Sequence, residues 1–159
     1  MTPEIIFLLF IVVLFFSLLF VYVEQKKLPY KKVSLFTNAE KNFLRVLDES
    51  VGDKYRVMGK PRIADVILPV RGLAYNNWKR HFFQISNKHF DFIILSKDTF
   101  SPVLAIELND KSHNKRKRKK RDALVERVCS SSGLPLLWIN AKRSYSMEEL
   151  KNKINSAIK

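Results

Sequence analysis

The stretch from residue 90 to residue 108, FDFIILSKDTFSPVLAIEL, predicts two buried strands joined by a short turn. Its apolar runs, at residues 90–95 and 103–108, are rich in Ile, Leu and Phe, which is typical of strands. The link between them, SKDTFSP, is short and made of turn-forming residues, so an antiparallel hairpin is the simplest connection. If Leu95 lies opposite Val103, the antiparallel register places Asp91 opposite Glu107.

Asp91 and Glu107 are the unusual residues of this hairpin, because isolated carboxylates are costly to bury. Opposed residues on one face have Cβ atoms about 4.5–5.5 Å apart, so two charged carboxylates there repel each other. Either one carboxyl is protonated, or a cation neutralises the pair. Mg²⁺ or Mn²⁺, completed by waters and substrate phosphate, suits two carboxylates. The alternative is that one or both pair with Arg or Lys, which are plentiful in this chain.

The residues that follow the second strand, Asn-Asp-Lys-Ser-His at 109–113, add polar candidates. Asn109 lies two residues after Glu107 and shares its face if the strand continues. Lys111 is placed to reach a phosphate or to polarise a water, and His113 to act as a base or to orient a ligand. A histidine in a strand-to-helix loop is also a common surface residue, and that interpretation stays open.

A run of seven cations, KRKRKKR, opens the next predicted helix at residues 115–121. The chain as a whole has 29 Lys and Arg against 15 Asp and Glu, a formal net charge of +14. This balance implies an acidic partner, either nucleic acid or an anionic membrane surface. Phosphate contacts from such a run give salt-dependent binding without sequence preference, while contact with anionic lipid and simple solvation are the alternatives. The candidate nucleic-acid-binding residues are Lys115, Arg116, Lys117, Arg118, Lys119, Lys120 and Arg121.

The segments around this centre predict helices packed against a sheet. Thr37-Asn38-Ala39-Glu40 is a capping-box pattern that opens a helix, and a second such pattern at residues 146–149 opens a last helix. Residues 55–58 and 136–139 predict strands, and residues 115–132 predict a helix that stops at a glycine.

Residues 59–89 are rich in loop-forming Pro and Gly, with a possible helix at residues 78–85. The element order is therefore α, β, an irregular region, β, β, α, β, α. This order predicts an α/β domain with an α+β mixed sheet, part of it antiparallel.

Residues 5–23, IIFLLFIVVLFFSLLFVYV, form an uncharged apolar segment. About 20 such residues at ~1.5 Å rise span a hydrocarbon core of ~30 Å. No Lys or Arg precedes the segment and no small-residue cleavage site follows it, which favours a transmembrane helix over a cleaved signal peptide. Lys26, Lys27, Lys31 and Lys32 follow it, so the positive-inside rule puts the C-terminal side in the cytoplasm.

The predicted organisation has three parts: a transmembrane anchor at residues 1–24, a basic linker at 25–36 and the α/β domain at 37–159. The expected location is the inner (cytoplasmic) membrane, crossed once, with the domain in the cytoplasm. The single cysteine, Cys129, excludes an internal disulfide and is expected to be a small buried hydrophobe.

Several of these motifs together resemble the bacterial domain of unknown function 2726 (DUF2726), over about residues 35–140. They are Asp91 in its apolar strand, Ile106-Glu107-Leu108, Asp110-x-Ser112-His113, Thr37-x-Ala39-Glu40-x-x-Phe43-Leu44, Arg121-Asp122 and Gly133-Leu134-Pro135-Leu136-Leu137. That family in turn resembles the PD-(D/E)XK nuclease superfamily. The resemblance implies a restriction-endonuclease-like core in the order α-β-β-β-α-β.

The resemblance also implies a metal-dependent endonuclease in which Asp91 and Glu107 bind the metal and Glu40 is an accessory acid. Glu40 is equally explained as the N3 residue of its capping box. The superfamily usually has Lys, and the smaller family Asp, at the position of Asn109. Asn109 can ligate through its carbonyl or orient a water, but it carries no positive charge, so Lys111 is a candidate from a shifted position.

The expected function is a membrane-anchored, Mg²⁺- or Mn²⁺-dependent nuclease that acts on DNA or RNA. Two alternatives remain. One is a catalytically degenerate, membrane-tethered nucleic-acid-binding module, and the other is an interaction domain associated with anionic lipid.

Overall fold

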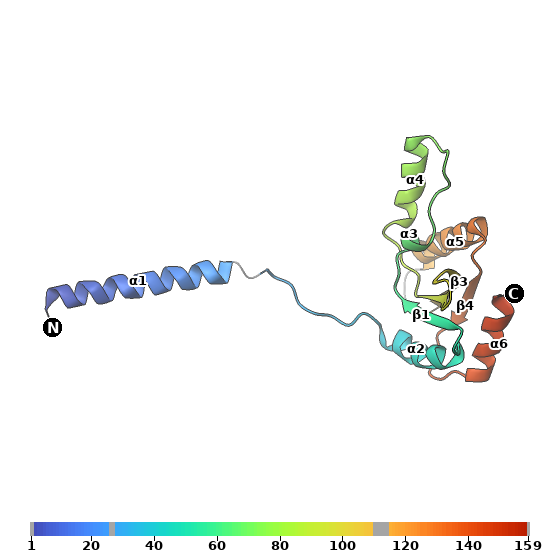
Figure 1. Ribbon diagram of the computed structural model, residues 1–159, viewed down its shortest axis with the longest axis horizontal. Helices are drawn as coiled ribbons and strands as arrows, with labels where there is room; N and C mark the ends of the chain where they lie inside the picture. Colours follow the sequence, from blue (N-terminus) through green and yellow to red (C-terminus); the bar gives the residue numbers. More distant parts are fainter. Residues whose placement is uncertain (1, 26–27, 110–114, 159) are drawn as a thin grey trace. The chain divides into compact units, whose positions relative to one another are not determined.

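The N-terminal apolar segment is one helix, α1 (Pro3–Gln25), in the computed structural model, which describes residues 2–25, 28–109 and 115–158 (Figure 1). Pro3 suits the first turn of a helix, where its missing N–H has no partner to lose. Residues Pro3–Glu24 contain an 18-residue window with a mean hydropathy of 3.2 and are long and apolar enough to cross a membrane. The chain divides into two units, Met1–Ser34 and Leu35–Lys159, and α1 belongs to the first.

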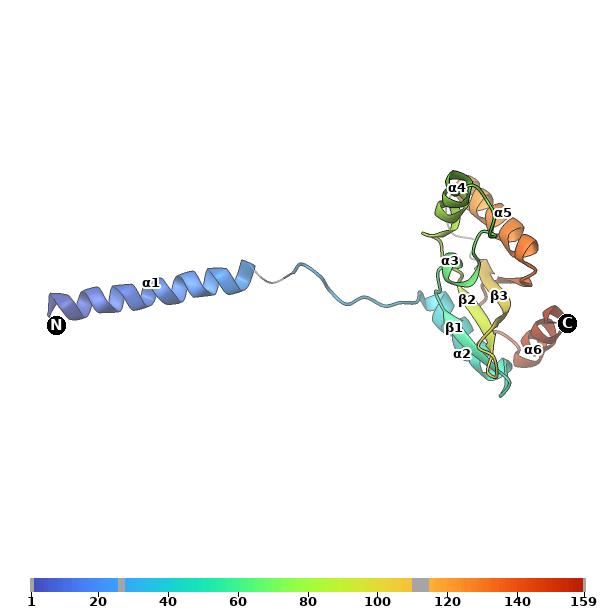
Figure 2. The ribbon, with the colours of Figure 1, turned by 45° about the horizontal axis from the view of Figure 1, so that its top comes forward.

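The second unit is a mixed α/β domain, as the element order predicts. Its elements are α2 (Asn38–Ser50), β1 (Tyr55–Gly59), α3 (Ile63–Val66), α4 (Tyr75–Ile85), β2 (Phe92–Ser96), β3 (Pro102–Asn109), α5 (Lys115–Ser132), β4 (Leu136–Asn140) and α6 (Met147–Ala157). Within the described ranges the strands form one four-stranded sheet in the order β1-β2-β3-β4, of which Figure 2 labels β1, β2 and β3. The β1–β2 and β2–β3 pairs are antiparallel, and β3–β4 is parallel, with α5 in the crossover between its strands.

The hairpin of β2 and β3 has the predicted register at its site end. Phe92 pairs with Ile106, which is the same register that places Asp91 opposite Glu107. Asp91 directly precedes β2, and Glu107 lies inside β3. The sequence therefore predicted correctly which two carboxylates meet across these strands.

The other end of the hairpin differs from the prediction. The expected pairing of Leu95 with Val103 is wrong, because the register shifts after Ile94 and Leu95 pairs with Pro102. Pro102 has no N–H to donate to the ladder, and an irregularity of this kind lets a short turn close without moving the rest of the register.

Helix caps follow the sequence patterns. Thr37 caps α2 with both bonds of the capping box, to and from Glu40. At the start of α6 the Ser146 hydroxyl accepts the bond from the N–H of Glu149, which is the first half of that motif. Gly133 follows α5 with φ +72°, a left-handed conformation that glycine adopts without steric cost.

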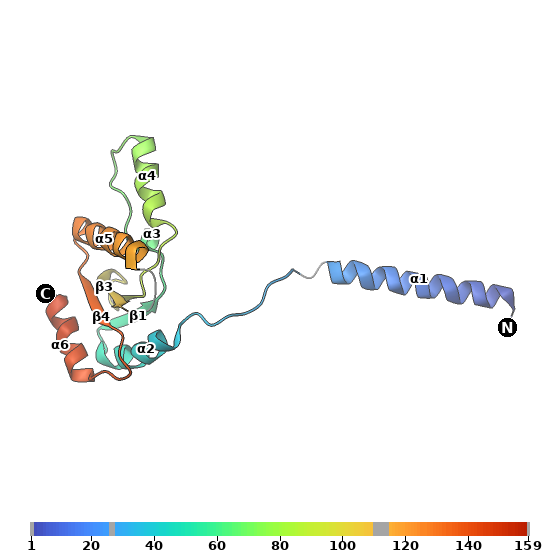
Figure 3. The ribbon, with the colours of Figure 1, turned by 180° about the vertical axis from the view of Figure 1, so that it is seen from behind.

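Two hydrophobic clusters cover the two faces of the sheet. Because side chains alternate along a strand, Phe92 and Ile94 face one cluster with α2 and α6, whereas Ile93 faces the other with α3, α4 and α5 (Figure 3). Phe90, which precedes β2, also lies in that second cluster. Cys129 lies in the second cluster, and burial raises the pKa of its thiol to about 12. This confirms the expected small buried hydrophobe.

Candidate functional site

A cleft of about 430 Å³ opens where β2 begins and β3 ends. Its lining comes from the N-terminal turn of α2, the ends of the two central strands, α5 and β4. The lining residues are Thr37, Ala39, Glu40, Asp91, Glu107, Leu108, Asn109, Arg121, Asp122 and Trp138. Three acids predicted as site residues therefore line one cavity, although the chain separates them by up to 67 positions.

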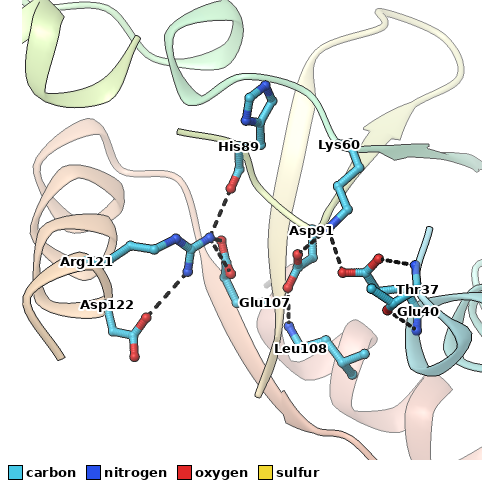
Figure 4. Close-up of polar contacts among 9 residues, drawn as sticks. All are labelled: Thr37, Glu40, Lys60, His89, Asp91, Glu107, Leu108, Arg121 and Asp122. Atoms are coloured by element: carbon cyan, nitrogen blue, oxygen red, sulfur yellow. Dashed lines mark hydrogen bonds and ion pairs between the residues drawn. The ribbon is translucent and has the colours of Figure 1, made fainter. Parts of the chain in front are cut away.

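Lys60 joins two of these acids (Figure 4). Its Nζ lies 2.6 Å from Glu40 Oε1 and 2.8 Å from Asp91 Oδ1. Asp91 Oδ2 accepts a further hydrogen bond from the backbone N–H of Leu108, at 2.9 Å. Burial acts to lower the pKa of Lys60, but its hydrogen bonds to Asp91 and Glu40 outweigh burial and raise it. The ammonium group therefore stays charged and fixes Asp91 against α2.

Glu107 is the most deeply buried acid of the cleft, at 2% exposure. Arg121 Nη2 reaches it from α5 and donates to both carboxylate oxygens at 3.0 Å (Figure 4). The same nitrogen donates to the backbone carbonyl of His89, at 3.0 Å. Burial raises the pKa of Glu107 to about 7; the charge of Arg121 opposes this rise and the charge of Asp91 adds to it. Glu107 is therefore an acid that titrates near neutral pH.

Of the remaining predicted site residues, some line the cleft, some are exposed elsewhere and some lie outside the described residues. Asn109 lines the cleft, and its amide nitrogen lies 3.5 Å from Asn140 Oδ1. Lys111 and His113 lie outside the described residues, as do the side chains of residues 115–118. Within the rest of the basic run, Lys119 and Lys120 are exposed, whereas Arg121 turns toward Glu107.

Both central carboxylates thus pair with a cation from the chain, which was the alternative to a metal. Asp91 pairs with Lys60, and Glu107 pairs with Arg121. Sequence reasoning had considered Arg121 only as a nucleic-acid contact and had missed Lys60.

The pairing of β1 with β2 explains why Lys60 lies beside Asp91. Gly59 pairs with Phe92, so the next positions along, Lys60 and Asp91, lie opposite each other, and the Lys60 N–H donates to the Asp91 carbonyl at 3.0 Å. Lys60 also has φ +58°, a left-handed conformation that is unfavourable for a residue with a Cβ. Such strain is often found at functional sites.

The carboxylate oxygens of the cleft are the kind of ligand that a hard divalent cation such as Mg²⁺ prefers. Among the described residues, no group of three or more His, Cys, Asp and Glu side chains is arranged to hold a metal. Mg²⁺ needs only one or two protein carboxylates, however, because waters and substrate phosphates complete its shell. Asp91 and Glu107 could supply these two carboxylates, although in this structure Lys60 and Arg121 pair with them.

Fold and cleft together define a class: a small mixed α/β domain with a buried acid–base cluster at its strand ends, in a chain that also carries an apolar helix long enough to cross a membrane. The chain belongs to the family described as protein of unknown function (DUF2726), whose model matches residues 32–158. The resemblance seen in the sequence motifs is thereby confirmed for this family. Comparison with curated proteins and with solved structures finds no match.

Proposed function

We propose that this protein is a membrane-anchored, metal-dependent nuclease that hydrolyses phosphodiester bonds of DNA or RNA at the cytoplasmic face of the inner membrane. The observation that carries the proposal is the meeting of Asp91 and Glu107, from neighbouring strand positions, in a cleft beside the basic helix α5. Apart from α3 and α4, which lie between β1 and β2, the elements follow the order α2, β1, β2, β3, α5, β4. This supports the proposal, because a restriction-endonuclease-like core has the same succession.

In this proposal Asp91 and Glu107 would hold Mg²⁺ or Mn²⁺, and the bound metal would supply an activated water and charge neutralisation at the phosphate. Lys60 supplies the positive charge that Asn109 cannot. Glu40 positions Lys60 through their 2.6 Å ion pair, which gives this acid a role beyond its cap. Asn109 orients a water through its amide.

The two ion pairs act as a resting state. Lys60 and Arg121 neutralise the carboxylates in the absence of metal, so the buried charge of Glu107 is compensated at all times. With the carboxylates holding metal, Lys60 and Arg121 would be free to donate to the phosphate oxygens. Arg suits this exchange, because its guanidinium fits carboxylate and phosphate equally well.

The anchor places this chemistry at a membrane. In the proposal α1 crosses the bilayer once, and Lys31 and Lys32 remain on the cytoplasmic side, as the positive-inside rule requires. The exposed Lys119 and Lys120 on α5 then contact the nucleic-acid backbone from the same side.

The test is cleavage of labelled DNA and RNA by the full chain in detergent micelles, with Mg²⁺, Mn²⁺ or a chelator. We expect metal-dependent cleavage that falls to the chelator level in Glu107→Gln. The matched control is Glu126→Gln, because Glu126 is an exposed acid on α5 and its loss leaves the cleft intact. Cleavage by the wild type that does not exceed that of folded Glu107→Gln would refute the enzymatic proposal.

A second candidate is a nucleic-acid-binding module without turnover. The presence of Asn109 where the superfamily has Lys, and the pairing of both carboxylates with cations, favour it. It predicts retention of labelled oligonucleotide that weakens with salt and without product formation. Replacing Lys119 and Lys120 by Gln would reduce this binding, whereas the same change at Lys151 and Lys153, on α6, would not.

A further inference from the structure

The segment from the end of α3 to the end of α4, residues 67–85, is here named the α4 arm. It lies within an acid-free stretch, because no Asp or Glu occurs from residue 66 to residue 90. The arm itself carries Arg71, Lys79 and Arg80. Figures 1 and 3 show that α4 projects beyond α3 and α5, away from the sheet. The arm is therefore a cationic projection that the proposed chemistry does not use.

The arm also exposes large apolar side chains. In its loop Leu68 is 60% and Val70 is 70% exposed, and on the helix Tyr75 is 72% and Phe83 is 57% exposed. Single exposed apolar residues are ordinary on a protein surface, but a group of them on one projecting segment marks an interaction site.

The base of the arm is fixed while its outer part stays uncovered. Ile85 is buried in the cluster with α3 and α5, and Trp78 stacks on Phe82 with ring centroids 5.1 Å apart. Lys79 Nζ lies 5.8 Å from the ring centroid of Tyr75 and 5.7 Å from that of Phe83. Cations and apolar groups are thus interleaved on a preformed helix.

We infer that the α4 arm is a membrane-contact surface, which inserts its apolar loop into the interface of an anionic bilayer. Basic residues beside aliphatic and aromatic ones are the composition of helices that lie in a membrane interface. Lys79 and Arg80 meet headgroup phosphates, while Leu68 and Val70 enter the acyl boundary. The exposed rings of Tyr75 and Phe83 would suit stacked bases as well, but the exposed aliphatic Leu68 and Val70 offer nucleic acid no such platform and suit acyl chains, which favours the membrane.

This inference rests on the anchor in the proposed function. Residues 26–36 span at most about 40 Å when fully extended, so α1 would hold the domain close to the bilayer. A tether of this length raises the effective concentration of the surface, and a weak contact of the arm is then sufficient. The domain is thereby held against the membrane, and its motion on the linker is restricted.

The test uses the full chain in phosphatidylcholine–phosphatidylglycerol vesicles with brominated acyl chains, which quench a fluorophore that reaches them. Single cysteines for the fluorophore are placed by Val70→Cys on the arm, Val12→Cys in α1 and Lys151→Cys on α6. The native Cys129 is buried and its thiol pKa is about 12, so it escapes labelling. Val70 and Lys151 are exposed, so both substitutions leave the packing intact.

We expect loss of fluorescence at positions 12 and 70 but not at 151. The loss at position 70 should shrink without phosphatidylglycerol and when Lys79 and Arg80 are changed to Gln. Quenching at 12 without quenching at 70 overturns the arm inference and leaves the anchor standing. Quenching at 70 alone supports the arm and refutes the anchor, and quenching at neither position refutes both. Equal quenching at 70 and 151, or a response at 70 only to added oligonucleotide, also overturns the inference.

Discussion

The cleft and the α4 arm depart from the usual pattern of burial in opposite directions. In the cleft a carboxylate, Glu107, is 2% exposed, whereas on the arm an aliphatic side chain, Val70, is 70% exposed. Burying a carboxylate lowers stability, and so does leaving an aliphatic side chain in water. Departures of this kind are expected where a chain keeps a group for function and not for stability.

The two regions differ in how these groups are compensated. Every acid in the cluster has a partner from the chain: Glu40 and Asp91 share Lys60, and Glu107 holds Arg121. On the arm the apolar side chains of Leu68, Val70, Tyr75 and Phe83 are exposed, and in our proposal the membrane covers them. Substitutions in the cleft should therefore damage the fold, and substitutions on the arm should damage only binding. The following stability predictions use residues 35–159, since both hydrophobic clusters lie within that unit.

The largest effect is expected for Arg121→Met. It leaves Glu107 buried without its cation, which should lower the free energy of unfolding by about 3 to 4 kcal/mol above pH 7. Below pH 6 the loss should be smaller, because Glu107 can then be protonated. Urea denaturation at two pH values measures this, with Arg127→Met on the exposed side of α5 as the control. Equal stability of the two variants would show that Glu107 does not depend on Arg121.

The change in the free energy of unfolding with pH should be nearly as large as the effect of Arg121→Met. The folded pKa of Glu107, about 7, exceeds its ordinary value of 4.5, so the folded state binds more protons than the unfolded state between these values. The free energy of unfolding therefore falls as pH rises from 4.5 to 7, by about 3 kcal/mol at most from this residue. Glu107→Gln should lack this fall. If the free energy of unfolding of the wild type minus that of Glu107→Gln stays constant or rises with pH, the raised pKa of Glu107 is contradicted.

An intermediate effect is expected at Lys60. Lys60→Ala removes the partner of Glu40 and Asp91, which should cost about 1–3 kcal/mol. Lys60→Gly removes the same ion pairs but relieves the left-handed backbone at φ +58°, so it should be more stable than Lys60→Ala by about 1 kcal/mol. The urea midpoints of the two variants measure this difference. If the midpoint of Lys60→Ala equals or exceeds that of Lys60→Gly, the backbone at this position is not strained.

The smallest effect is expected on the arm. Val70→Ser should change the free energy of unfolding by no more than about 0.5 kcal/mol, because the side chain makes no buried contact to lose. Ile63→Ala, which removes a buried side chain of α3 just before the arm, should cost about 2–5 kcal/mol and serves as the contrast. A large loss of stability in Val70→Ser would mean that the arm is part of the core and not a docking surface.

Much of the domain could be predicted from local patterns. Runs of apolar residues predicted the three strands β2, β3 and β4, and capping residues such as Thr37 predicted where helices begin. The pairing of Asp91 with Glu107 was predicted from the length of one loop and is correct, although the register shift after Ile94 replaces the expected loop-end pair of Leu95 and Val103. These features depend on neighbours in sequence, which is why they could be read without the fold.

The rest depends on contacts between distant segments. The partner of Asp91, Lys60, is 31 positions away and is set by the pairing of β1 with β2, for which no short loop gives the register. Arg121 was identified as a cation, but only the packing of α5 turns it toward Glu107. The helix α3 lies where Pro and Gly suggested a loop, because Ile63 is fixed by tertiary packing. The sequence indicated a helix at residues 78–85, and α4 begins three residues earlier, at Tyr75.

The central claim is that Asp91 and Glu107 form a site for a divalent cation that competes with Lys60 and Arg121. Crystals of residues 35–159 soaked in Mn²⁺ test it directly, since the anomalous signal of manganese locates the ion. We predict a peak coordinated by both carboxylates, with the Lys60 and Arg121 ion pairs opened. A cleft without an anomalous peak, with both ion pairs retained at saturating Mn²⁺, would contradict the claim.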